Sequence, residues 1–430
     1  MTEASELKFK KLIPQLTPKG FNTFGDIHRS EISAICEAID NPVEEYAQSI
    51  AINIKDDLSL LTVVDRGSGM TQADLANCVD IGADSGKSNR GWGGRGIGLK
   101  TSFATIGHRL DIFTSSDGSE VLHLIMEIKP PTYDADGVPS YEEPLIGMQE
   151  ASAQERNRFF EYLDKLDAMD KMNNFERDAV RGRGTVLNIS NTRNFSMDHR
   201  SLVLELRNKV SQKYRSFIDD GLRIYINDDV PLVSVSPLAG SGDILLNEER
   251  VYKDNHRVRI IAKHLDSTSA GSHNRLCTEN QGVYFLRNRN EVGTAQAVGR
   301  DKHNSFNGFR VEVYYTGTLD AEVSVLATKD HVRLSLDFQQ WLAAIILPLM
   351  TQSKTLKEGR ANAKRAAKEA AATVSRGTPS PQQIQQIRKS IEQELLVDVK
   401  IQAAIDSGVI APSYVKYLAR RLSGCVTLIP

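Results

Sequence analysis

The stretch GWGGRGIGLKTSFATIG, residues 91–107, contains six glycines and runs into a segment with the character of a short helix. A backbone so rich in glycine lets another group approach closely, and N–H groups at a helix start bind phosphate oxygens. Two familiar phosphate-binding motifs can be set aside. In GADSGKS, residues 82–88, three residues separate the glycines where a P-loop needs four. GWGGRG matches GxGxxG, but a polar turn precedes it instead of the strand that a dinucleotide site requires.

Composition limits the class of protein. The chain has 430 residues, a formal net charge of −2, and neither an apolar run long enough to span a membrane nor a signal-peptide pattern. Its four cysteines lack the spacing of a zinc site or disulfide framework. The sequence predicts a soluble, cytoplasmic protein of two or three domains, with no membrane partner and no global attraction to nucleic acid.

The order of patterns predicts an α+β protein. A helix is expected from about residue 27 to Asn41, because Pro42 disfavours helix in the residue before it, and short strands follow within residues 50–64. We expect a first domain over 1–199 with an insertion at about 130–180. A second α/β domain over 200–350 and a helical region over 351–430 complete the prediction.

Two short motifs upstream contain candidate functional groups. Glu37 and Asn41 lie four residues apart, so a helix places them on one face, where a carboxylate can orient water and an amide can hold magnesium. In VVDRGSGM, residues 63–70, a strand runs into Asp65, whose carboxylate can accept a hydrogen bond from an exocyclic base amine. Taken alone, the first pair is also compatible with a solvated helix face and the second motif with a plain turn.

Two further segments complete a pattern. In GRGIGLK, residues 94–100, alternating glycines precede a helix start, and Lys100 adds a positive charge. In GRGTVLNI, a Gly-Thr pair begins a strand, where the Thr185 hydroxyl can bond a base or an ordered water. The order E(x)3N, DxGxGM, GxGxGLK and GT before a strand resembles the signature of the GHKL ATPases. The resemblance covers about residues 25–195, and AICEAIDNPVEE is most similar to the MORC-type members.

This resemblance implies a Bergerat-type α/β sandwich that binds ATP and Mg²⁺. Glu37 would be the general base, Asn41 the magnesium ligand and Asp65 the partner of the adenine amine. The remaining positions expected to contact the nucleotide are Gly67, Gly69, Met70, Gly94, Gly96, Gly98, Leu99, Lys100 and Thr185. Asp40 also matches the MORC-type pattern, without an assigned role.

The resemblance also implies a transducer-like second domain that contributes a lysine to the γ-phosphate. Lys329, in VSVLATKDHVRLS, is the candidate, with an exposed loop lysine as the alternative. Arg287 and Arg289 are weaker candidates, interpreted as surface or interface charges. His303 and His331 lack partners at metal-ligand spacing.

The implied function is Mg²⁺-dependent ATP hydrolysis that drives ATP-gated dimerisation of the N-terminal domains, a molecular clamp. The C-terminal helices would contact a partner protein, and a role in DNA transactions or defence rests on analogy alone. The alternatives are a chaperone-like remodelling ATPase, a histidine-kinase-type phosphotransferase and a non-hydrolysing ATP-binding module. The presence of both Glu37 and Asn41 argues against the last.

Overall fold

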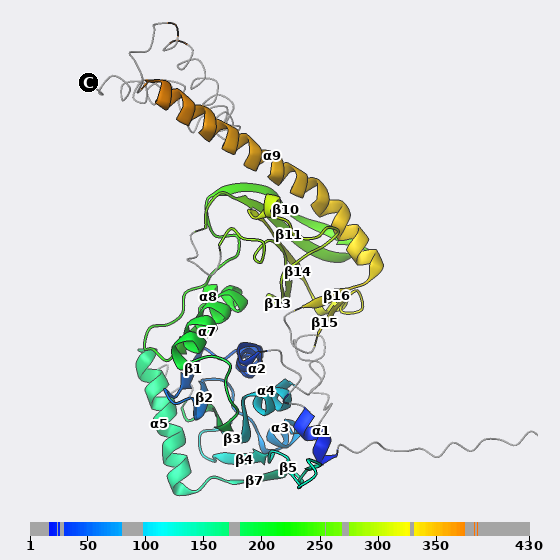
Figure 1. The fold of residues 1–430 in the computed structure, drawn as a ribbon. Coiled ribbons are helices and arrows are strands. Elements are labelled where there is room, and N and C mark those ends of the chain that lie inside the picture. Colours follow the sequence, from blue (N-terminus) through cyan, green and yellow to red (C-terminus); the bar gives the residue numbers. More distant parts are fainter. Residues whose placement is uncertain are drawn as a thin grey trace, which may run out of the picture. The chain divides into compact units, whose positions relative to one another are not determined.

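The computed structural model describes residues 17–23, 25, 30–79, 98–171, 181–253, 255–268, 275–326 and 331–374, together with residues 382 and 385. The chain divides into two compact units, Met1–Lys354 and Thr355–Pro430. The described residues of the first unit form two large sheets and two small two-stranded ones, together with helices (Figure 1). The mixed α+β class expected from the sequence is confirmed.

The first sheet has seven strands in the order β7-β4-β3-β8-β2-β1-β9. Its neighbouring strands are antiparallel except β1 and β9, which run parallel. The bounds are β1 Ser49–Ile54, β2 Leu60–Asp65, β3 Gly107–Ser115, β4 Leu122–Glu127, β7 Leu145–Glu150, β8 Gly184–Thr192 and β9 Arg223–Ile226. The expected hairpin across Ser-Asp-Gly is confirmed as β3 and β4.

Three helices cover one face of this sheet, α2 Glu31–Glu44, α4 Gly98–Ile106 and α7 His199–Lys213. Alternate residues of β1, such as Ile50 and Ile52, pack into the same buried cluster as the apolar stripes of these helices. Short helices α1 Pro18–Thr23, α3 Gln72–Asn77 and α8 Arg215–Asp219 complete this part of the chain. The side of the sheet that carries α2 is therefore the side where the nucleotide site is expected.

The predicted end of α2 at Asn41 is wrong. The helix continues through Pro42, which is buried, to Glu44. Pro42 has no N–H to donate, but the helical hydrogen bonding continues after it, since the Glu45 N–H donates to the Asn41 carbonyl at 3.1 Å. The backbone at the expected magnesium ligand is thus helical.

The described residues of the segment expected as an insertion, 130–180, add a strand and a helix to the first sheet, and the insertion itself stays a prediction. Strand β7 forms one edge, and α5 Ala153–Met169 covers the face opposite α2 through Phe159, Leu163 and Leu166. The small strands β5 Thr132–Tyr133 and β6 Pro139–Ser140 pair with each other. The result is a sandwich in which both faces of the central strands are buried.

The second sheet has five strands in the order β10-β11-β14-β12-β13. Their bounds are β10 Gly242–Tyr252, β11 His256–Leu265, β12 Gly282–Arg287, β13 Asn290–Gln296 and β14 Phe309–Tyr315. The short helix η3 Asn304–Phe306 lies between β13 and β14. The elements after β14 are η4 Gly317–Leu319, β15 Val323–Val325, β16 Val332–Leu334 and α9 Leu336–Val374. Because β9 belongs to the first sheet, that sheet extends beyond residue 199, where we expected the first domain to end. The domain limits themselves stay a prediction.

Helix α9 begins against the second sheet. Phe338, Leu342, Ile346 and Met350 recur every four residues and join the buried cluster of that sheet. From Thr355 onward α9 belongs to the second compact unit, and its described side chains to Glu369 are exposed or half-buried. Nearly all of the remaining C-terminal region, for which further helices are expected, lies outside the described residues.

Candidate functional site

Glu37 and Gly98 bring α2 and α4 together. The Glu37 side chain is only 5% exposed, and a Cβ atom added to Gly98 would lie 1.9 Å from Glu37 Oε1. A real side chain cannot occupy that position without moving the carboxylate. Gly98, the last of the alternating glycines, therefore leaves the space that the Glu37 carboxylate occupies.

Hydrogen bonds fix this pair of helices. The Ser102 hydroxyl donates to the Ala34 carbonyl at 2.6 Å, and the Thr101 hydroxyl donates to the Gly98 carbonyl at 2.9 Å. Ser30 caps α2 by accepting from the Ser33 N–H. The Ser102 bond holds α4 beside α2, and the other two stabilise the start of each helix.

Asp65 and Thr185 face each other on neighbouring strands. They are direct partners in the antiparallel register of β2 and β8, at the end of each strand. Asp65 Oδ1 accepts the Gly67 N–H at 2.8 Å. Burial raises the pKa of the Asp65 carboxyl to about 7, against the lowering effects of that N–H and of the Arg66 charge. The strand ends thus present a buried carboxyl that titrates near neutral pH.

Thr114 connects the strand ends to the turn that follows β2. Its hydroxyl lies 3.1 Å from the Thr185 hydroxyl and accepts the Met70 N–H at 2.8 Å. Gly69 has φ +67°, and an added Cβ would lie 1.9 Å from the Ser115 carbonyl oxygen. Only glycine allows this turn to lie against β3, which explains the second glycine of the DxGxG motif.

Other expected residues lie around these two pairs. Asn41 is exposed on α2, Leu99 is half-buried and Lys100 is 3% exposed on α4. Gly94, Gly96 and Lys329 lie outside the described residues, so their expected roles stay predictions.

The residues present are compatible with a magnesium ion held mainly by phosphates. Among the described residues there is no group of three or more His, Cys, Asp or Glu side chains that could hold a metal alone. Mg²⁺ commonly takes one or two protein ligands and completes its shell with phosphate and water oxygens. An exposed amide at Asn41, on the helix of Glu37, suits that mode of binding.

Sequence reasoning missed Thr114 and gave no role to Asp40. Asp40 is 1% exposed and accepts from Lys213 Nζ at 3.1 Å and from the Tyr214 hydroxyl at 2.9 Å. Asn290 also donates to it at 3.1 Å. These partners lie more than 170 residues away in sequence, so no local signal indicates them.

Of the two weaker arginine candidates, expected as surface or interface charges, Arg289 is exposed and Arg287 is buried. Arg287 donates to Asp320 at 2.6 Å, and Arg289 donates to the Ser216 carbonyl at 2.6 Å. Arg289 also pairs with Asp220 at 2.5 Å. Both guanidinium groups are therefore engaged by protein partners.

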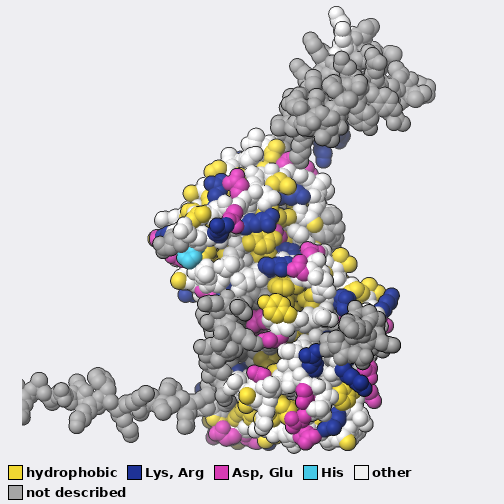
Figure 2. All heavy atoms as spheres, turned by 180° about the vertical axis from the view of Figure 1, so that it is seen from behind, with side chains coloured by type: hydrophobic (Ala, Val, Ile, Leu, Met, Phe, Trp, Pro, Cys, Tyr) yellow, Lys and Arg dark blue, Asp and Glu magenta, His cyan; other side chains and the backbone are white. Residues whose placement is uncertain are grey.

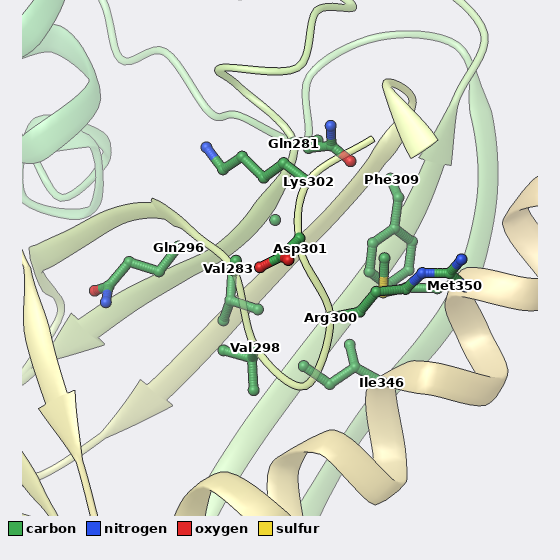
Figure 3. A pocket seen from close by; sticks show the side chains of 12 residues that line it. Gln281, Val283, Gln296, Val298, Arg300, Asp301, Lys302, Phe309, Ile346 and Met350 are labelled. Atoms are coloured by element: carbon green, nitrogen blue, oxygen red, sulfur yellow. The ribbon is translucent and has the colours of Figure 1, made fainter. Parts of the chain in front are cut away.

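A small cavity lies between α9 and the second sheet. Val283, Val298 and Ile346 point into it, with Arg300 and Lys302 at its rim (Figure 3). Its volume is about 10 Å³, enough for about one water molecule. This cavity is too small for a nucleotide.

The described surface and helices give two further observations. On the face drawn in Figure 2, basic and acidic side chains are interspersed among the coloured residues. Within the described part of the chain, none of the helices combines the length and apolar character needed to cross a bilayer.

Comparison with known proteins finds one matching family. Residues 28–142 match the family of histidine kinase-, DNA gyrase B- and HSP90-like ATPases. The resemblance to GHKL ATPases is therefore confirmed for this part of the chain, which is similar in sequence to their ATPase domain.

The similar proteins are of the MORC kind. Protein MICRORCHIDIA 2 of Arabidopsis thaliana is 34% identical over 106 residues, which cover 23% of this chain and 17% of that protein. Protein MICRORCHIDIA 1 is 33% identical over 106 residues, with the same two shares, and MICRORCHIDIA 3 is 39% identical over 90 residues, with shares of 19% and 15%. The matched stretch thus spans about a sixth of the length of these relatives.

Proposed function

We propose that this chain binds ATP with Mg²⁺, hydrolyses it, and uses the γ-phosphate to bring two copies of its N-terminal region together. The observation that carries the proposal is the approach of the Glu37 carboxylate to Gly98, beside the start of α4. A carboxylate at that place is suited to orient and deprotonate a water molecule that attacks a phosphate bound by the helix start.

Asp65 and Thr185 would hold the base. Because Asp65 Oδ1 already accepts the Gly67 N–H, Oδ2 is the oxygen that we assign to the exocyclic amine of adenine. Thr185, held by Thr114, would support that contact directly or through a water. Gly67, Gly69 and Met70 shape the turn beside this pair.

Asn41 would hold Mg²⁺, which when bound neutralises charge on the phosphate oxygens. Lys100 and the 94–98 glycines would contact those oxygens. Asn41, Lys100 and these glycines are each close in sequence to Glu37 or Gly98. The contact between Glu37 and Gly98 therefore supports their assignment.

Lys329 would supply a positive charge to the γ-phosphate. The Leu326 N–H donates to the His331 carbonyl at 3.1 Å, so the residues on either side of the 327–330 segment are close together. His331 lines a cavity of about 420 Å³ with Ser33, which lies one helical turn before Glu37 on α2. This location of the flanking residue supports the assignment of Lys329.

The experiment that tests the clamp is sedimentation velocity with and without nucleotide. A non-hydrolysable ATP analogue with Mg²⁺ is expected to shift the full chain from monomer to dimer, and ADP is expected to leave the monomer. A parallel series with double-stranded DNA tests the DNA role. An unchanged sedimentation coefficient at saturating analogue would contradict ATP-gated pairing.

A further inference from the structure

The helix that carries Glu37 is joined to the second sheet through one buried carboxylate. Asp40 Oδ1 accepts from the Tyr214 hydroxyl and from Asn290 Nδ2, and Oδ2 accepts from Lys213 Nζ. The Tyr214 hydroxyl oxygen also lies 2.7 Å from the Cys36 carbonyl oxygen, so its single proton is shared between the two acceptors. A buried charge is stable only while such donors surround it, so the position of α2 depends on them.

One donor comes from the tip of a hairpin in the second sheet. Strands β12 and β13 are joined by Asn288 and Arg289, whose φ angles of +45° and +74° are both positive, as tight two-residue turns require. Asn290 follows directly and is 0% exposed. The turn therefore aims one amide from the second sheet at α2.

The hairpin has its own anchors away from α2. Arg289 binds the Ser216 carbonyl, and Glu291 pairs with Arg215 at 2.6 Å. Arg215 also pairs with Glu312 of β14 at 2.7 Å. These bonds connect the hairpin to the α7–α8 region and to β14, and Asn290 connects it to Asp40.

Asp40 and Glu37 lie three residues apart and are neighbours on α2. We infer that Asp40 is a positioning residue through which the β12–β13 hairpin holds Glu37 in register with Gly98, so that the second sheet controls turnover at the nucleotide site. This inference rests on the proposed hydrolysis for its kinetic effect, but the mechanical link is independent of it.

The test uses the full chain with Asn290→Ala, and Tyr214→Phe as a second variant that removes one donor and keeps the buried ring. Tyr284→Phe is the matched control, because it deletes a buried hydroxyl bond to the Asn280 carbonyl on the adjacent part of the same sheet. Hydrogen exchange of residues 31–44 and steady-state ATP hydrolysis are measured for each protein.

Asn290→Ala is expected to speed amide exchange in α2 by at least fivefold and to leave α5 unchanged. Turnover is expected to fall at least tenfold, with ATP affinity within threefold of wild type. The double exchange Asp40→Asn with Asn290→Asp reverses donor and acceptor, keeps one hydrogen bond, and is expected to recover part of the turnover.

Unchanged exchange in α2 for both Asn290→Ala and Tyr214→Phe would overturn the link, whether or not ATP is hydrolysed. If Tyr284→Phe speeds exchange in α2 and lowers turnover as much as Asn290→Ala does, the effect comes from weakening the sheet in general. That result would also overturn the link. If the wild type binds no ATP, the proposed function fails while the exchange result still decides the link.

Discussion

Glu37 of α2 and Gly98 of α4 are so close that a methyl group on Gly98 would lie 1.9 Å from the Glu37 carboxylate. The two residues are separated by 61 positions in sequence, and the hydrogen bond from Ser102 to Ala34 holds their helices together. This contact brings the first and third motifs of the signature into one place. It is the geometric basis for assigning hydrolysis to this region.

Gly98→Ala is expected to abolish turnover without unfolding the protein. The added Cβ forces the Glu37 carboxylate away, and a displaced general base costs about 100-fold or more in rate. Phosphate release and thermal unfolding are measured together. Gly147→Ala is the control, since nothing lies within 4 Å of its added Cβ. Wild-type turnover in Gly98→Ala would contradict the assignment.

The pKa of Asp65, raised to about 7 by burial, predicts a pH-dependent stability. Between about pH 4 and pH 7 the folded protein binds this proton and the unfolded chain does not, so stability falls as pH rises. Relative to Asp65→Asn, the wild type should lose up to about 1.4 kcal/mol of unfolding free energy per pH unit in this range. Urea denaturation at pH 5, 6 and 7 measures the difference, and parallel curves for the two proteins would refute it.

The buried pair of Arg66 and Asp167 joins the strand-end motif to α5, with Arg66 Nε donating to Asp167 Oδ1 at 2.6 Å. Arg66→Leu leaves a buried carboxylate unpaired and is expected to cost about 3–5 kcal/mol of unfolding free energy. Adding Asp167→Leu should recover much of that loss. Chemical denaturation of the three proteins tests this. A double variant no more stable than the single one would mean that the charges themselves are not the cause.

Lys329→Ala is expected to reduce turnover at least tenfold and to change ATP affinity less than threefold, because the lysine is assigned to charge that develops during phosphate transfer. Lys302→Ala is the control, a lysine between β13 and η3 that is bonded to the Glu279 carbonyl. Steady-state hydrolysis and calorimetric titration separate the two effects. Similar losses in both variants would remove Lys329 from the mechanism.

Local patterns predicted the local parts of the fold. The hairpin of β3 and β4 and the helix after the glycine loop follow from turn residues and helical spacing within a few positions. The four motifs predicted the candidate site residues. In the structure, Glu37 lies beside Gly98, and Asp65 is the strand partner of Thr185.

Contacts between distant segments could not be predicted in the same way. The position of α5 is one example, because its apolar stripe does not indicate which surface it covers. Asp40 gave no signal, since its partners Lys213 and Asn290 lie 173 and 250 residues away in sequence. Pro42 misled the helix boundary, because it removes only its own N–H bond, and the helix continues to Glu44, with the Glu45 N–H bonded to the Asn41 carbonyl.

The most direct measurement is calorimetric titration of Mg²⁺-ATP into wild type, Glu37→Ala and Asp65→Asn, followed by phosphate-release assays on the same samples. The account predicts that wild type binds and hydrolyses, that Glu37→Ala binds without hydrolysis, and that Asp65→Asn does not bind. Equal affinity in wild type and Asp65→Asn, or undiminished phosphate release by Glu37→Ala, would contradict it.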